Sequence, residues 1–273
     1  MSTLSPDQVP EAWGAIVADY EEAFEGLTTQ FAADVLRLLD LKPGERVIDV
    51  AAGTGAFSLM AARAGIEVLA TDFAPGMVAR IRERIAAANV TGISAEVMDG
   101  QALTVADASF DAGVSILGLI FFPDIAKGLT ELRRVLRSGG RAAVVCWSDP
   151  GSLPLMTLLA RSIQKVVPDF RPPAAVPVWA RLAGPSSVRD QMLGAGFREV
   201  EVTTSTRHLK IESPRSFWTH FTCSAPPLAY LFKELGPDRT EAVGREYLQA
   251  LCATSSDGSP TLSVEGCIGV GRF

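Results

Sequence analysis

The stretch of sequence that decides the fold is VIDVAAGTGAF, residues 47–57. It begins as the apolar end of a buried strand, in which Asp49 is the one acid. Small residues follow that let the backbone approach a ligand closely, and then a helix begins whose first N–H groups lack partners within the helix. In parallel α/β sheets, nucleotides bind at such turns. A tight packing turn between strand and helix would need Gly and Ala as well, so this stretch alone leaves both interpretations open.

Apolar strands and helices alternate around this turn. The pattern predicts strands at 46–50, 67–71, 93–98, 111–115, 141–147, 199–211 and 262–273. It predicts helices at 57–64, from Pro75 onward, and at 124–136, 151–167, 186–193, 214–221 and within 228–251. Short strands that alternate with helices are typical of a doubly wound α/β fold, with a mostly parallel sheet covered on both faces.

The N-terminal segment carries apolar residues at helical spacing from Trp13 to Leu27, which predicts one helix with a single apolar stripe. A second helix is expected from Thr28 to Leu39. We therefore expect residues 1–40 to form an N-terminal helical cap, 41–150 a ligand-binding core, and 151–273 further cap insertions with the final strands of the same domain.

Composition and charge exclude several classes of protein. The chain has 273 residues, 48% hydrophobic composition and a formal charge of −6. Lys and Arg are scattered, whereas a nucleic-acid binder usually shows a basic stripe, so no nucleic-acid partner is expected. The four cysteines lack CxxC spacing and there are two histidines, so we expect no metal site. Neither a signal peptide nor a membrane span is apparent, which predicts a cytoplasmic protein.

Two further acids follow the next two strands. Asp72 ends the second strand, where a carboxylate can accept two hydrogen bonds from a ribose diol or can cap the helix that begins near Pro75. Asp99 and Gly100 follow the third strand and suit either an adenine edge or a plain turn. Because three successive strands end in an acid or a Gly-rich turn at one edge of a sheet, their coincidence favours a nucleotide-type site.

These motifs resemble those of the class I S-adenosylmethionine-dependent methyltransferases, especially the branch that contains ubiquinone and menaquinone biosynthesis methyltransferases. The family's first motif stands here as Asp49-x-Ala51-x-Gly53-x-Gly55, and its second and third acids fall on Asp72 and Asp99. Residues 108–115 match its fourth strand, and residues 132–140 match the helix and turn before its fifth. The resemblance spans residues 40–150 and implies a Rossmann-like, seven-stranded sheet that is mostly parallel with an antiparallel last strand, plus a helical cap.

The same resemblance implies S-adenosylmethionine as cofactor, S-adenosylhomocysteine as product, and a role for each matching residue. The first Gly position holds Ala51, and Ala still lets the backbone come close if its φ is negative, so we expect intact binding. Tyr20 would close over the cofactor, although a core role for Tyr20 and Trp13 stays open because both lie on the apolar stripe. The implied contacts are Asp49, Gly53, Thr54 and Gly55 for the methionine part, Asp72 for the ribose, Phe73, Met77, Asp99, Gly100 and Gln101 for the adenine, and Ser115 and Ile116 behind the sulfonium.

Competing enzyme classes lack their motifs here. A nicotinamide dehydrogenase would need GxGxxG, a nucleoside triphosphatase would need a lysine after the turn, and a serine hydrolase would need GxSxG. A relative that keeps the cofactor pocket but acts as a cyclase or as a binding module remains the alternative to a methyltransferase.

Methyl transfer requires mainly the alignment of nucleophile, methyl and sulfur, and a general base only when the acceptor is protonated. His208 and His220 are the candidate bases, each with a surface or structural role as the competing interpretation. We expect the N-terminal helices and the segments 151–184 and 212–252 to roof an acceptor pocket. Aromatic residues there favour a small phenolic or quinone-like acceptor, and they are Phe121, Phe122, Phe170, Trp179, Phe217, Trp218, Phe221 and Tyr230.

Overall fold

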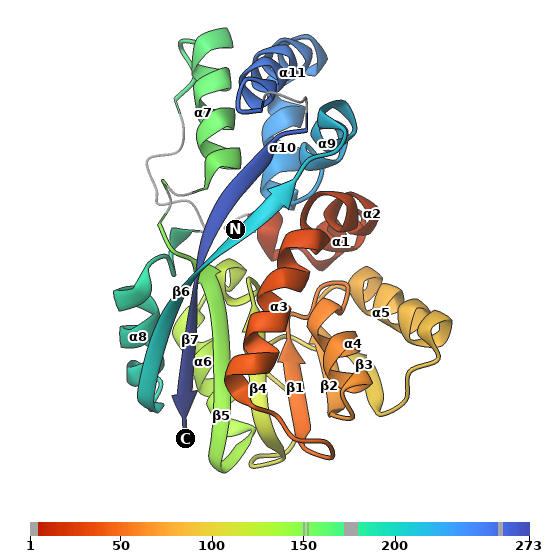
Figure 1. The fold of residues 1–273 in the computed structure, drawn as a ribbon, viewed down its shortest axis with the longest axis vertical. Helices are drawn as coiled ribbons and strands as arrows, with labels where there is room; N and C mark the ends of the chain where they lie inside the picture. Colours follow the sequence, from red (N-terminus) through yellow and green to blue (C-terminus); the bar gives the residue numbers. More distant parts are fainter. Residues whose placement is uncertain (1–4, 150, 152, 172–179, 256–258) are drawn as a thin grey trace.

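The computed structural model describes residues 5–149, 151, 153–171, 180–255 and 259–273. They form a seven-stranded sheet in the order β3-β2-β1-β4-β5-β7-β6 (Figure 1). β7 runs antiparallel to both of its neighbours, while the pairs from β3 to β5 are parallel. This confirms the predicted sheet, whose strands are β1 (Arg46–Val50), β2 (Glu67–Asp72), β3 (Ile93–Val97), β4 (Phe110–Ile116), β5 (Leu136–Trp147), β6 (Arg198–Lys210) and β7 (Thr261–Arg272).

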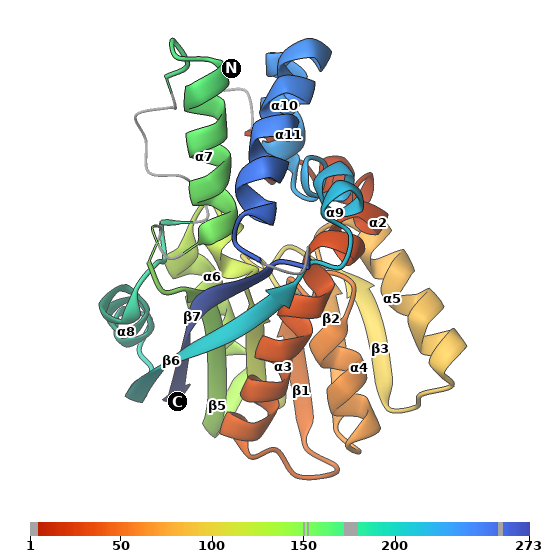
Figure 2. The same ribbon diagram turned by 45° about the horizontal axis from the view of Figure 1, so that its top comes forward.

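Helices cover both faces of the sheet, as the alternating pattern requires (Figures 1 and 2). One face carries α3 (Gly26–Leu39), α4 (Ala56–Arg63) and α5 (Pro75–Ala88), and the other carries α6 (Ile125–Arg134) and α8 (Pro185–Gly194). The helix expected at 124–136 ends earlier, because Leu136 already pairs with Phe110 and begins β5.

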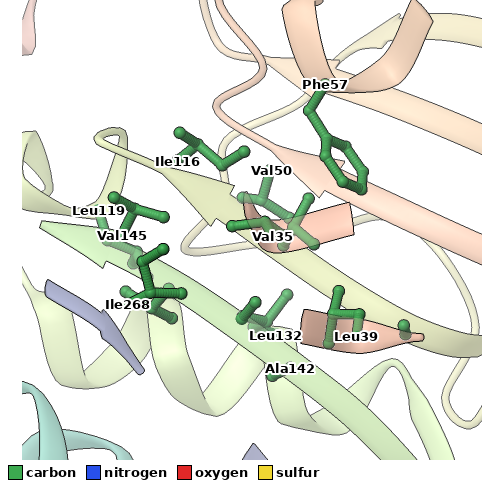
Figure 3. Close-up of a cluster of buried hydrophobic side chains, with 14 of the residues drawn as sticks. Val35, Leu39, Val50, Phe57, Ile116, Leu119, Leu132, Ala142, Val145 and Ile268 are labelled. Atoms are coloured by element: carbon green, nitrogen blue, oxygen red, sulfur yellow. The ribbon is translucent and has the colours of Figure 1, made fainter. Parts of the chain in front are cut away.

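The central strands are buried on both faces and anchor the main hydrophobic core (Figure 3). Val35 and Leu39 of α3 pack on one side, and Leu132 of α6 packs on the other. Contact there is close, since a Cβ added at Gly113 of β4 would fall 2.6 Å from Leu132 Cδ1. Each fully buried side chain of this kind contributes about 1.5–3 kcal/mol. The core therefore holds the carboxyl ends of the strands in fixed positions.

The N-terminal segment differs from its prediction. The expected single helix is divided into α1 (Pro10–Gly14) and α2 (Val17–Tyr20), and a π-helical turn at Glu21–Glu25 then joins α2 to α3. The boundary expected at Thr28 is wrong, because the Thr28 hydroxyl donates to the carbonyl of Phe24 (2.9 Å) inside the helix instead of capping it. A break after α1 allows it to cross α5 closely.

Four helices form a layer beyond the carboxyl ends of the strands (Figures 1 and 2). We call this layer the helical cap: α7 (Pro154–Val166), α9 (Pro214–Phe221), α10 (Pro226–Leu235) and α11 (Pro237–Cys252). Its apolar side chains form a second core, separate from the core of the sheet. None of the helices in the described ranges is long and apolar enough to cross a membrane.

Candidate active site

A cavity of about 280 Å³ lies at the carboxyl edge of the sheet. Its floor comes from the segments after β1, β2, β3 and β4, which the parallel register brings to one edge. Its cover comes from the N-terminal segment. The lining residues are Asp7, Gln8, Trp13, Tyr20, Ala51, Gly53, Asp72, Phe73, Met77, Met98, Asp99, Gly100, Gln101, Ile116, Leu117, Gly118, Phe121, Phe122 and Pro123.

Most of the residues predicted to bind the cofactor line this cavity. Those that do not are Asp49, Thr54, Gly55 and Ser115. Asp49 lies behind the turn, where its carboxylate accepts a hydrogen bond from Ser58 Oγ (2.6 Å). The Ser115 hydroxyl accepts one from the Leu119 backbone N–H (3.2 Å). The structure thus gives these side chains local partners below the surface of the cavity.

Asp72 connects the glycine turn to the start of α5. One carboxylate oxygen accepts a hydrogen bond from the Gly53 N–H (2.9 Å), and the other accepts one from the Ala74 N–H (2.9 Å). Ala74 is the residue that precedes α5, so Asp72 serves the helix start and also lines the cavity. Burial raises the pKa of Asp72 to about 6. Asp72 therefore bonds to the backbone just before α5 without capping the helix itself, and it lines the cavity.

The cavity floor is rich in buried negative charge. Burial, together with the nearby carboxylate of Asp72, raises the pKa of Asp49 to about 7. Removing the last proton from this pair leaves two buried anions close together, which a bound cation would stabilise. A positively charged ligand would thus stabilise the ionised forms of these two carboxyl groups.

The turn after β1 corrects one expectation from the sequence. Ala51 has a φ of 56°, not the negative value on which intact binding was based. A non-glycine residue in this left-handed region costs about 1–2 kcal/mol. The Ala51 methyl group faces Gly118, where an added Cβ would fall 2.5 Å from it. Gly118 thus provides the space that an alanine at position 51 requires.

Two residues of the N-terminal segment close the cavity. The Trp13 indole N–H donates to the carbonyl of Asp7 (3.0 Å), and its ring packs edge-to-face on Phe121 with 4.9 Å between centroids. The Tyr20 hydroxyl lies 3.3 Å from Thr28 Oγ1. A Cβ added at Gly53 would be 3.4 Å from the same Tyr20 hydroxyl. Burial raises the pKa of Tyr20 to about 12. Both aromatic residues pack in a small apolar cluster and also line the cavity.

Ion pairs hold this segment over the site. Arg80 pairs with Glu21 (2.8 Å), and Arg84 pairs with Glu25 (2.5 Å). Arg84 also donates to the carbonyl of Thr54 in the glycine turn (3.0 Å). The π-helical turn next to Tyr20 is thereby connected to both α5 and the floor of the cavity.

The two histidines lie away from the cavity. His208 is exposed on β6, with Nδ1 at 3.2 Å from Ser263 Oγ. His220 of α9 has Nδ1 at 2.9 Å from Asp19 Oδ1, and thus connects the helical cap to α2. Neither residue lines the cavity.

The helical cap contributes less to the site than its aromatic content predicted. No residue after Pro123 in the described ranges lines the cavity, so the roof expected from 151–184 and 212–252 is not found among them. Phe121 and Phe122 line it, whereas Tyr230 is exposed and Trp179 lies outside the described residues. The remaining aromatic candidates pack in or against the second core, namely Phe170, Phe217, Trp218 and Phe221.

Sequence reasoning missed Asp7 and Gln8. Both lie in the short 3₁₀ turn Pro6–Gln8, just before the apolar stripe, and both line the cavity. The available signal was an acid after Ser-Pro at a helix start, which is also a common capping pattern. Within the described part of the chain, no cluster of three or more His, Cys, Asp or Glu could hold a metal ion.

Comparison with known proteins adds to this geometry. Residues 48–144 match the family model described as a methyltransferase domain. An uncharacterized protein of Mycobacterium tuberculosis H37Rv is 28% identical over 245 residues, which cover 89% of this chain and 87% of that protein. A demethylmenaquinone methyltransferase of Corynebacterium kroppenstedtii is 36% identical over 143 residues, or 52% of this chain and 59% of that enzyme. The crystal structure of the Bacillus subtilis protein YcgJ superposes with a TM-score of 0.60 at 15% identity, covering 88% of this chain and 97% of that one.

The strand order and the cavity at the carboxyl edge define the Rossmann-like class of α/β enzymes. Together with the methyltransferase domain matched over residues 48–144 and the similarity to demethylmenaquinone methyltransferases, they support a class I S-adenosylmethionine-dependent methyltransferase. S-adenosylmethionine is its cofactor.

Proposed function

We propose that this cavity binds S-adenosylmethionine and that the enzyme transfers the methyl group to an O, N or C nucleophile of a small-molecule acceptor by in-line displacement. The observation that carries the proposal is the convergence of the glycine turn, Asp72 and Asp99 on one cavity that Trp13 and Tyr20 cover. When bound, the cofactor supplies a methyl group that is already activated by its sulfonium.

The residues of the floor fit this cofactor. Asp72 faces the cavity beside Gly53, and its carboxylate can accept hydrogen bonds from a ribose diol. Burial raises the pKa values of Asp49 and Asp72 because it disfavours their anions, and a bound sulfonium would stabilise those anions. Only glycine fits at position 100, because a Cβ there would fall 2.5 Å from the Phe122 ring.

Hydrogen bonds fix the turn that we assign to the adenine side. Asp99 Oδ1 accepts a hydrogen bond from the Gln101 N–H (2.8 Å), and Gln101 Oε1 accepts one from the Asp124 N–H (3.0 Å). The turn after β3 is therefore held to the start of α6, and Phe73 and Met77 line the cavity with it. We assign these side chains to adenine, and the apolar Ile116 to the region of the sulfonium.

For the acceptor, we propose a small phenolic or quinone-like metabolite. Aromatic side chains of Trp13, Phe121 and Phe122 line the cavity and suit a flat apolar molecule. The C. kroppenstedtii relative is a demethylmenaquinone methyltransferase, and this name supports such an acceptor. The four free cysteines agree with the cytoplasmic location that forms part of the proposal.

The experiment that tests the cofactor site is calorimetric titration of the wild type, Asp72→Asn and Asp107→Asn with S-adenosylmethionine and S-adenosylhomocysteine. Asp107 is an exposed loop carboxylate outside the cavity and provides the matched control. We expect Asp72→Asn to weaken binding by at least ~10-fold, about 1.4 kcal/mol, and Asp107→Asn to bind like the wild type. Absence of binding to the wild type would contradict the proposal.

A cyclase or a binding module is the alternative that keeps the same cavity. Incubation with methyl-labelled S-adenosylmethionine and a panel of phenols, quinols and amines distinguishes it. Transfer of label with release of S-adenosylhomocysteine supports the methyltransferase, and tight binding without release for every acceptor supports the alternative.

A further inference from the structure

Asp7 lines the cavity, and one of its carboxylate oxygens has no hydrogen-bond partner. The residue is 5% exposed and lines the cavity. Oδ1 accepts a hydrogen bond from Ser5 Oγ (2.6 Å), and the backbone carbonyl accepts one from the Trp13 indole (3.0 Å). Oδ2 is buried and has no hydrogen-bond partner. The surrounding contacts thus fix the position of the residue and leave one oxygen free.

A buried carboxylate oxygen without a partner is costly, so a structure that retains one calls for an explanation. The lining residues include no Lys, Arg or His, and none of their neutral donors bonds to Oδ2. The ionisable residues among them are Asp7, Asp72, Asp99 and Tyr20. A ligand that donates a hydrogen bond, or one that carries positive charge, would satisfy Oδ2.

Asp7 comes from a different segment than the two carboxylates assigned to the nucleoside. Asp72 and Asp99 follow β2 and β3 on the floor, and the proposed function assigns both to the nucleoside. Asp7 belongs to the cover, on the segment that Trp13 joins to Phe121. The cofactor's ribose and adenine thus have their own carboxylates, and Asp7 is left for the second ligand.

We propose that Asp7 determines acceptor specificity: Oδ2 accepts a hydrogen bond from an N–H or O–H group of the acceptor. This inference rests on the proposed function and deepens it. It assigns the acceptor to neutral or cationic small molecules with an amine or hydroxyl donor, and it excludes carboxylates and phosphates, which three lining carboxylates would repel.

The test uses three probes that share one ring and differ in head group: benzylamine, benzyl alcohol and benzoate. Each is titrated by calorimetry into protein saturated with S-adenosylhomocysteine. Asp7→Asn removes the charge and keeps the shape, and Asp7→Ala removes the acceptor oxygen. Glu11→Gln makes the same carboxylate-to-amide change at an exposed residue of the same segment and serves as control.

For an ammonium donor, we expect the wild type and Glu11→Gln to bind benzylamine at least ~10-fold more tightly than benzoate, and Asp7→Asn to reduce this preference to ~3-fold or less. For a hydroxyl donor, benzyl alcohol binds best, and Asp7→Ala weakens it by at least ~5-fold. A wild type that does not discriminate against benzoate, or that binds none of the probes, overturns the inference. The inference is also overturned if the preference for benzylamine or benzyl alcohol over benzoate persists in both Asp7 variants.

Binding of S-adenosylhomocysteine itself separates the two proposals. It should stay within ~3-fold of the wild type in every Asp7 variant. If the wild type binds S-adenosylhomocysteine but the probes reveal no role for Asp7, this inference alone fails. If the wild type does not bind S-adenosylhomocysteine, the proposed function fails together with it.

Discussion

The floor of the cavity and the helical cap are both rich in residues that suggested a site, but the two regions use them differently. On the floor, the sequence motifs mark positions where the backbone needs a turn after a strand, or where only a glycine fits against an aromatic ring. These residues meet at one edge of the sheet. In the cap, the aromatic residues pack on one another: Trp218 and Phe221 lie 4.9 and 5.7 Å from the Tyr247 ring. An inserted layer buries its own apolar surface first, so aromatic content alone does not locate a pocket.

The N-terminal segment lies between these two regions and is bonded to both. Arg84 connects it to the floor through Glu25 and the Thr54 carbonyl. His220 connects it to the cap through Asp19. The cover therefore links the cap to the floor of the cavity through these contacts.

The largest expected effect comes from filling a glycine on the floor. At Gly100 an added Cβ would fall 2.5 Å from the Phe122 ring, and at Gly244 in the cap it would fall 2.6 Å from Trp218 Nε1. Overpacking of this kind costs about 1–3 kcal/mol at either place. We expect Gly100→Ala to lower turnover by ~100-fold, about 2.7 kcal/mol, through lost cofactor affinity. Gly244→Ala should destabilise the fold about as much as Gly100→Ala, seen as a similar fall in Tm, but it should keep the affinity for the cofactor. Equal losses of cofactor affinity in the two variants would contradict the comparison.

The next effect tests how the cover is held. Arg84→Met removes the ion pair with Glu25 and the bond to the glycine turn, so affinity for S-adenosylmethionine should fall by ~10-fold, or about 1.4 kcal/mol. Arg245→Met removes an exposed pair with Glu241 in the cap and should leave the affinity unchanged. Calorimetry measures the affinity of both variants for S-adenosylmethionine. An unchanged affinity in Arg84→Met would show that the contacts of Arg84 are not needed to hold the cover.

Cofactor affinity should depend on pH. The pKa is raised to about 6 for Asp72 and to about 7 for Asp49, so both carboxyls are protonated at pH 5 and ionised at pH 8. Affinity for the cationic S-adenosylmethionine should therefore rise by ~10-fold across this range, and less for S-adenosylhomocysteine, which lacks the sulfonium. Asp49→Asn should flatten the upper part of the profile. A flat wild-type profile would show that these groups do not titrate on binding.

The same pKa shifts affect folding with a defined sign. A carboxyl whose folded pKa exceeds its unfolded value of about 4 stabilises the fold below that value and loses this contribution as pH rises through the folded pKa. For Asp72 and Asp49 the loss falls between pH about 4 and about 7. In urea titrations, Asp49→Asn should reduce the dependence of the free energy of unfolding on pH.

These contrasts also explain what the sequence could predict. The sheet followed from alternating apolar segments, and much of the floor followed from turns that parallel strands bring together. The cover did not: the stripe from Trp13 to Leu27 resembles one helix, and its break depends on contact with α5. Likewise, the positive φ of Ala51 is possible because Gly118, far along the chain, leaves room for its methyl group. Features that rest on such distant contacts have no local signal.

A smaller effect is expected at the histidines. His220→Ala breaks the bond to Asp19 and loosens the cover, so turnover should fall by a few-fold, whereas His208→Ala should resemble the wild type. A general base would contribute about 10²-fold or more. If turnover falls by that much in either variant while the cofactor affinity is retained, that histidine acts as a general base.

The smallest effect concerns Ala51, whose φ of 56° is unfavourable for every residue except glycine. Ala51→Gly should relieve this strain, while the greater freedom of glycine in the unfolded chain offsets part of the gain. A net increase of about 0.5–1 kcal/mol in the free energy of unfolding is expected, measured by urea titration. Ala253→Gly, at an exposed position with a φ of −67° in the cap, has no strain to relieve and should destabilise instead. If both variants lose stability, the surrounding contacts hold Ala51 without appreciable strain, and the floor is more relaxed than its backbone angles indicate.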